Sequence, residues 1–158
     1  MATPASEEPT RDVARIVEVG AKEITEREAV AECTITMTPE AVAHLVAGTP
    51  KGNPLEAARI AGIMAVKRTP DLLPFCHPIA VTGAEVTVDP APEDGRIRVQ
   101  ATVRARDRTG VEMEALTASA VAALSLYDTA KAYDRSAVIS GLRLVSKRGG
   151  KSGDYHAG

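Results

Sequence analysis

Tryptophan is absent from the sequence, and phenylalanine occurs once, at Phe75. Aromatic residues make up 3% of the chain, so it lacks the side chains on which RNA-binding modules stack bases. Two cysteines cannot build a disulfide framework, and a chain of 158 residues does not require one. No apolar run approaches the roughly 18 residues of a membrane-spanning helix. Residues 1–12 also lack the basic-then-apolar order of a signal peptide.

Neither sign of charge dominates, because 19 Lys and Arg oppose 21 Asp and Glu, for a formal net charge of −2. This balance predicts no nucleic-acid partner, and the missing apolar runs predict no membrane partner. We expect a cytoplasmic protein in a reducing compartment. The hydrophobic residues, 44% of the chain, suffice for one ordinary core. Residues 1–12, with Pro4 and Pro9, are expected to form a flexible tail before a single domain at residues 13–158.

The clearest pattern is an alternation of apolar and polar residues, which indicates half-buried strands. Strands are expected at residues 30–37, 81–88, 96–106 and 138–147. Helices are expected at residues 39–47, 54–68 and 111–134, and three prolines between residues 69 and 78 predict an ordered turn. This order predicts an α+β chain with the ferredoxin-like β-α-β-β-α-β arrangement. Its antiparallel sheet would carry helices on one face, with an extra helix in the first crossover.

The helix expected at residues 54–68 is apolar nearly all round. Such a helix is usually covered on more than one side.

Asp128 and Lys131 lie three residues apart near the end of the longest helix, so they share one face. They directly follow residues 115–127, thirteen residues without a charge. One interpretation is a surface ion pair, which adds little to stability. The other is a carboxylate and an ammonium group at the rim of a dry helix, with pKa values tuned for proton transfer. At the start of the same helix, Glu112 and Glu114 either complement the helix dipole or belong to a site.

The segment Phe75, Cys76 and His77 lies between two prolines. It either presents polar groups to a ligand or forms a rigid surface turn. A zinc site is not expected, because zinc takes three or four ligands and the other cysteine and histidines show no ligand spacing. We therefore expect no metal.

The last residues are rich in glycine and basic side chains, which is typical of an oxyanion site or of a disordered basic tail. Lys147, Arg148 and Lys151 supply positive charge, and glycines let backbone N–H groups approach an oxyanion. Lys51 and Lys67 are further candidate anion contacts, with simple solvation as the alternative.

The length of the last helix separates two of these candidates. Glu114 and Asp128 are fourteen residues apart, which places them about 21 Å apart along the helix axis. One small-molecule pocket cannot readily use both from the same chain. Two such helices packed antiparallel would bring Glu114 of one chain near Asp128 of another. The spacing therefore predicts a site shared across a two-fold interface.

Three stretches, in this order, resemble one enzyme family: KGNPLEAARIAGIMAVKRTPDLLPFCHPI, TGVEMEALTASAVAALSLYDTAKA and SKRGGKSGDY. The family is the cyclic pyranopterin monophosphate synthases (the protein C family of molybdenum-cofactor biosynthesis), and the resemblance covers about residues 14–155. Two departures are visible. Val17-Glu18-Val19-Gly20 stands where the family commonly reads Val-Asp-Val-Ser/Thr, and Phe75 stands where leucine is common.

The resemblance implies a lyase that converts (8S)-3′,8-cyclo-7,8-dihydroguanosine 5′-triphosphate to cyclic pyranopterin monophosphate and diphosphate without a cofactor. It implies that Asp128 is the catalytic acid/base and Lys131 its partner. With the patterns above, it leads us to expect ten substrate contacts: Lys51, Lys67, Phe75, Cys76, His77, Glu112, Met113, Glu114, Lys147 and Lys151. It also implies a homohexamer, a trimer of dimers with sites at the dimer interface, and makes residues 13–158 a catalytic domain.

The alternative is a non-catalytic, metabolite-binding regulatory domain of the same ferredoxin-like fold. The pair Asp128 and Lys131 weighs against it, because a passive sensor needs no acid and base.

Overall fold

The computed structural model describes residues 12–158. All but one residue of the tail expected at 1–12 therefore lies outside the described residues. The strands are β1 (Thr25–Thr36), β2 (Val81–Ala91), β3 (Arg96–Asp107), β4 (Val138–Arg148) and β5 (Tyr155–His156). The helices are α1 (Pro39–Ala47), α2 (Pro54–Leu72) and α3 (Glu112–Ala130), and a single 3₁₀ turn, Pro92–Asp94, joins β2 to β3.

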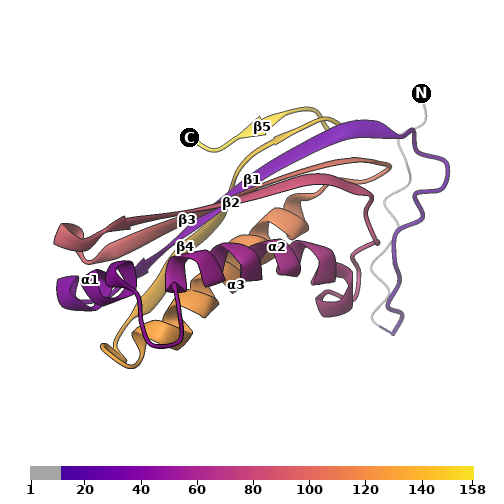
Figure 1. Cartoon of the computed structure of the whole chain (residues 1–158). Helices are drawn as coiled ribbons and strands as arrows, with labels where there is room; N and C mark the ends of the chain where they lie inside the picture. Colours follow the sequence, from indigo (N-terminus) through magenta and orange to yellow (C-terminus); the bar gives the residue numbers. More distant parts are fainter. Residues whose placement is uncertain (1–11) are drawn as a thin grey trace.

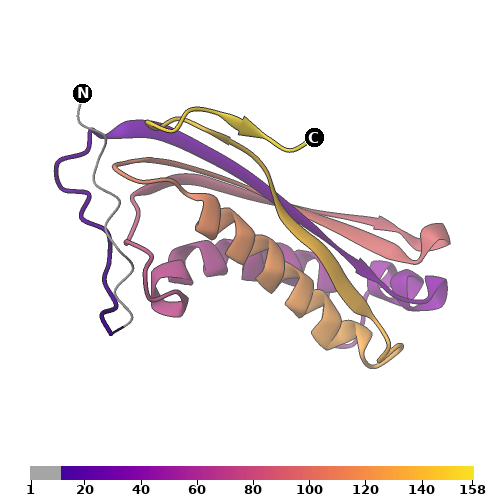
Figure 2. The same ribbon diagram turned by 180° about the vertical axis from the view of Figure 1, so that it is seen from behind.

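The strands form one antiparallel sheet in the order β2-β3-β1-β4-β5. The three helices lie on one face of it, and the other face is open (Figures 1 and 2). The first four strands have the order of the ferredoxin-like fold, with α1 as the extra helix in the first crossover. The predicted α+β architecture is confirmed. Strand β5 was not expected, because two residues are too short to show an alternation.

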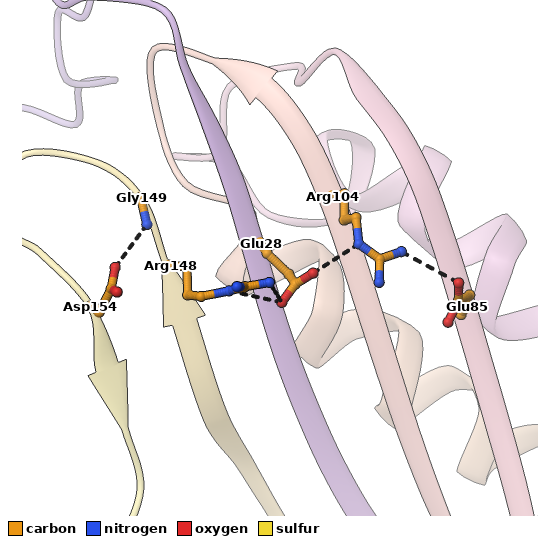
Figure 3. Close-up of polar contacts among 6 residues, drawn as sticks. All are labelled: Glu28, Glu85, Arg104, Arg148, Gly149 and Asp154. Carbon is orange, nitrogen blue, oxygen red and sulfur yellow. Dashed lines mark hydrogen bonds and ion pairs between the residues drawn. The ribbon is translucent and has the colours of Figure 1, made fainter.

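Alternation in β1 sends successive side chains to opposite faces of the sheet. Ala31, Cys33 and Ile35 are buried under the helices. Glu28 and Glu32 lie on the open face, where each carboxylate bonds an arginine of β3 and another of β4. Figure 3 shows the row through Glu28. Hydrogen bonds from these arginines hold the pKa of both carboxyls below its usual value.

Two helix ends differ from the sequence expectation. Helix α2 runs to Leu72 and includes Pro70, where we expected a turn from residue 69. Pro70 is two residues from the end, so its missing N–H removes a bond from the last turn only, and Leu73 N–H closes the helix on the Thr69 carbonyl at 3.0 Å. Helix α3 ends at Ala130 rather than 134, because the chain then bends into a turn whose N–H groups converge on the Ala130 carbonyl.

Small side chains let α3 pack closely against both the sheet and α2. Gly62 of α2 shows how closely, because a Cβ there would lie 2.9 Å from Val86 Cγ2 and 3.1 Å from the Ala118 carbonyl oxygen. The opposite side of α2 is bare: Ile60 and Met64 are 51% and 58% exposed. The chain by itself thus covers this apolar helix on one side only. None of the helices within residues 12–158 combines the length and the apolar character that a membrane-spanning helix needs.

Candidate active site

The candidate residues of α3 lie at its two ends. Helices α2 and α3 run antiparallel, so the loop before α2 lies at the C-terminal end of α3 (Figures 1 and 2). Lys51 of this loop, Asp128 and Lys131 line one cavity of about 560 Å³. The structure thus brings together the expected acid/base pair and one expected anion contact.

The ion pair at this end is short but exposed. Lys131 Nζ donates to Asp128 Oδ1 at 2.7 Å, and the two side chains are 54% and 70% exposed. The hydrogen bond and charge of Lys131, with a smaller effect from Lys51, hold the pKa of Asp128 below its usual value. Asp128 is therefore a carboxylate at neutral pH, stabilised in its ionised form. The dry rim expected from the sequence is not present in a single chain, so drying requires a covering surface.

A different environment surrounds the N-terminal end of α3. Glu114 is only 3% exposed, and burial raises the pKa of its carboxyl, with smaller effects from the charges of Glu112 and Asp107. Burial, followed by the charge of Glu114, also raises the pKa of the Cys76 thiol. The two ends of α3 thus offer opposite chemistry. A carboxyl disposed to keep its proton lies at the N-terminal end, and one disposed to lose it lies at the C-terminal end.

His77 lies near the N-terminal end of α3, as Glu114 does, and a backbone carbonyl group holds its ring. Its Nε2 donates to the Val17 carbonyl at 2.6 Å, which places the ring proton on Nε2, because a carbonyl only accepts. The adjoining segment is tied to the end of β3, where Asp107 Oδ2 accepts from Ala80 N–H at 2.8 Å. Residues 12–24 lie alongside the connection between α2 and β2 (Figures 1 and 2). At the departure from the family pattern, Glu18 accepts from Gly20 N–H at 2.7 Å and closes its own turn.

The basic residues of the C-terminal segment separate. Lys147 Nζ pairs with Glu112 at 3.1 Å and donates to Ser152 Oγ at 3.1 Å, so it belongs to the N-terminal end of α3. Arg148 instead bonds Glu28 on the open face of the sheet (Figure 3). Arg148 and Lys147 thus lie on opposite faces of β4, because successive residues of a strand point to opposite faces.

Four of the expected substrate contacts have exposed side chains that take no part in the bonds described above. Phe75 and Met113 are exposed although they are large and apolar. Lys67 on α2 and Lys151 in the turn after β4 are exposed and make no side-chain hydrogen bond or ion pair within residues 12–158. All four are accessible to a ligand.

The cavity at the C-terminal end of α3, called the C-terminal cavity below, also has lining residues that the sequence did not indicate, among them Tyr127, Tyr133 and Arg135. Tyr127 belongs to the uncharged stretch, where only its position before Asp128 marked it. Tyr133 stacks on His44 of α1, with ring centroids 4.3 Å apart. Arg135 lies in an irregular turn, where no periodicity indicates the direction of a side chain.

Metal ligands are not gathered anywhere in residues 12–158, where no three His, Cys, Asp or Glu side chains are placed to hold an ion.

Comparisons with known proteins agree over nearly the whole chain. The model of the MoaC family matches residues 16–150. A relative from Pelotomaculum thermopropionicum is 54% identical over 146 residues, which cover 92% of this chain and 86% of the relative. A relative from Parvibaculum lavamentivorans is 52% identical over 149 residues, 93% of this chain and 92% of the relative. Both are named cyclic pyranopterin monophosphate synthase. With a family match of this extent and relatives this similar, the chain belongs to the MoaC family.

Proposed function

We propose that this chain is a lyase of molybdenum-cofactor biosynthesis. It converts (8S)-3′,8-cyclo-7,8-dihydroguanosine 5′-triphosphate to cyclic pyranopterin monophosphate and diphosphate. The observation that carries the proposal is the relationship to synthases that are half identical over nine tenths of the chain. The regulatory alternative is not favoured, because these relatives bear the name of an enzyme.

The reaction requires several proton transfers. Rings of the substrate open and reclose, and a sugar hydroxyl attacks the α-phosphorus while the bond to the diphosphate leaving group breaks. Asp128, ionised beside Lys131, serves as the base, and Lys131 returns a proton as the acid. Positioned groups of this kind typically contribute about 10²–10⁴-fold in rate.

The N-terminal end of α3 complements this pair. Glu114, with its raised pKa, is suited to donate a hydrogen bond or a proton to the ring system. Around it, Phe75, Cys76, His77 and Met113 contact the base of the substrate. Glu112 holds Lys147 in place at 3.1 Å. We propose that Lys51, Lys67, Lys147 and Lys151 neutralise the triphosphate.

One pocket requires both ends of α3, and these are about 21 Å apart in one chain. We propose that each site combines the Asp128 end of one protomer with the Glu114 end of its partner, in a homohexamer built as a trimer of dimers. Exposed Ile60 and Met64 on α2, and exposed Leu124 on α3, support an assembly that covers these helices. Each protomer then contributes a single catalytic domain, residues 13–158, and the assembly acts in the cytoplasm.

The decisive experiment supplies the purified protein with the cyclic dihydro-GTP and measures both products. We expect one diphosphate for each cyclic pyranopterin monophosphate formed. A protein that binds the substrate without releasing diphosphate would be a sensor, and the proposed reaction would be wrong.

A further inference from the structure

The turn that follows α3, residues 131–136, forms one wall of the C-terminal cavity. The N–H groups of Tyr133 and Asp134 both donate to the Ala130 carbonyl at 2.8 Å, which closes the turn on the helix. Asp134 then fastens it from two sides. Its Oδ2 accepts from Thr38 N–H at 2.9 Å, at the start of α1, and its Oδ1 accepts from Ser136 N–H at 2.9 Å. The turn is therefore tied to α1 as well as to α3.

Arg135 has two further anchors beside it. The Tyr127 hydroxyl donates to the Arg135 carbonyl at 3.0 Å, so α3 holds the backbone at this residue. Two residues before Arg135, the ring of Tyr133 stacks on the ring of His44, with an angle of 8° between the ring planes. None of these bonds uses the guanidinium group. The side chain of Arg135 thus extends from a backbone that is already fixed, which lowers the entropy that binding would cost.

The guanidinium of Arg135 has no ion-pair partner within residues 12–158, although it lines the cavity. Three cations line this cavity, Lys51, Lys131 and Arg135, against the single carboxylate of Asp128. Lys131 is already bonded to that carboxylate. Two unpaired cations remain, on two different elements. The cavity therefore has an excess of positive charge, which favours the binding of an anion.

We propose that Arg135 is a substrate-binding residue that contacts an oxyanion of the triphosphate, with Lys51 supplying the second cation. This rests on the proposed function, because it takes the C-terminal cavity as part of the active site. A guanidinium offers two parallel N–H donors that match two oxygens of one phosphate, whereas an ammonium is a point charge. We therefore predict that the variant Arg135→Lys keeps only part of the affinity for the triphosphate.

Steady-state turnover of the cyclic dihydro-GTP by Arg135→Gln and Arg135→Lys tests the proposal. We expect Arg135→Gln to raise KM about 10- to 100-fold, the range for one lost charge-assisted contact, and to change kcat little. Arg135→Lys should fall between it and the wild type. The matched control is Arg106→Gln, since Arg106 is an exposed arginine of β3 without an ion-pair partner in residues 12–158. Equal KM values for Arg135→Gln and the wild type would overturn the proposal.

A binding measurement separates this inference from the proposed function. Isothermal titration with inorganic triphosphate needs no turnover, and we expect the wild type and Arg106→Gln to bind more tightly than Arg135→Gln. That result in a protein without synthase activity would reject the proposed reaction and leave the anion contact standing. Equal affinity of all three proteins, or no binding by the wild type, would reject the role of Arg135.

Discussion

Asp128 is the side chain to which we assign the proton transfer in the proposed reaction. As an exposed partner of Lys131 it resembles many surface ion pairs, and such pairs contribute little to stability. The ion pair lowers the pKa of Asp128 whether the residue is catalytic or purely structural. Only a measurement of activity therefore distinguishes the two roles.

Asp128→Asn keeps the size of the side chain but removes its ability to take a proton. We expect turnover to fall about 10²–10⁴-fold while the melting temperature and the oligomeric state stay as in the wild type. Lys131→Ala should cost a similar factor, and the double variant much less than the product of both, because the two groups act as a unit. The measurements are turnover of the cyclic dihydro-GTP and thermal melting.

Asp71→Asn is the matched control, because Asp71 forms an exposed ion pair with Arg68 that has the same i,i+3 spacing. Near-normal turnover of Asp128→Asn would remove this residue from the mechanism.

Glu114 makes the stability of the fold depend on pH. Its folded-state pKa is raised above the ordinary 4.5, so the folded protein holds this proton where the unfolded chain has released it. Stability is therefore full below the ordinary value and falls as the pH rises through the raised pKa. Glu114→Gln removes the buried charge and should raise the melting temperature at about pH 7, with a smaller gain at about pH 4.

Melting curves of both proteins at the two pH values check this. Glu40→Gln serves as the control, since Glu40 is an exposed acid in the first turn of α1. An equal gain at both pH values would show that burial of the charge is not the cause.

The helix pair α2 and α3 depends on the absence of one side chain. Gly62→Ala would bring a Cβ to 3.1 Å from the Ala118 carbonyl oxygen, and a backbone atom cannot move aside as a flexible side chain can. We expect a loss of about 1–3 kcal/mol in the free energy of unfolding, as for other overpacked interiors.

Urea unfolding measures this loss. Gly83→Ala in β2 is the control, because a Cβ there meets nothing within 4 Å. Equal unfolding midpoints for the two variants would contradict the close packing.

Most elements could be predicted from local sequence. The alternation of Ala31, Cys33 and Ile35 indicates a strand with one buried face, and the structure confirms it. Helix ends were less predictable, because the effect of Pro70 depends on how many residues follow it in the helix. For the site, local spacing placed Asp128 and Lys131 on one face. It could not show that the turn at Arg135 faces the same cavity, since hydrogen bonds to α1 determine the course of that turn.

The whole molecule is expected to work only as an assembly, because the two ends of α3 lie far apart. Separately inactive Glu114→Ala and Asp128→Ala proteins should regain activity when mixed. Random exchange between protomers would leave roughly a quarter of the sites intact, since half of the dimers are mixed and each has one complete site. The measurement is diphosphate release after subunit exchange has been verified by mass. No recovery would reject a site built from these positions on two chains.

Glu28 and Glu32 also affect how the chain finds its fold. A strand displaced by one residue would turn its apolar side chains to water, but a strand displaced by two would keep them buried. The alternation of β1 therefore does not exclude the second error. In the native pairing each of these carboxylates bonds an arginine from both neighbouring strands. A displacement of β4 by two residues along β1 would move Arg148 away from Glu28 and Arg143 away from Glu32. These ion pairs, the first of which Figure 3 shows, therefore penalise a misfolded sheet that hydrophobic burial alone would tolerate.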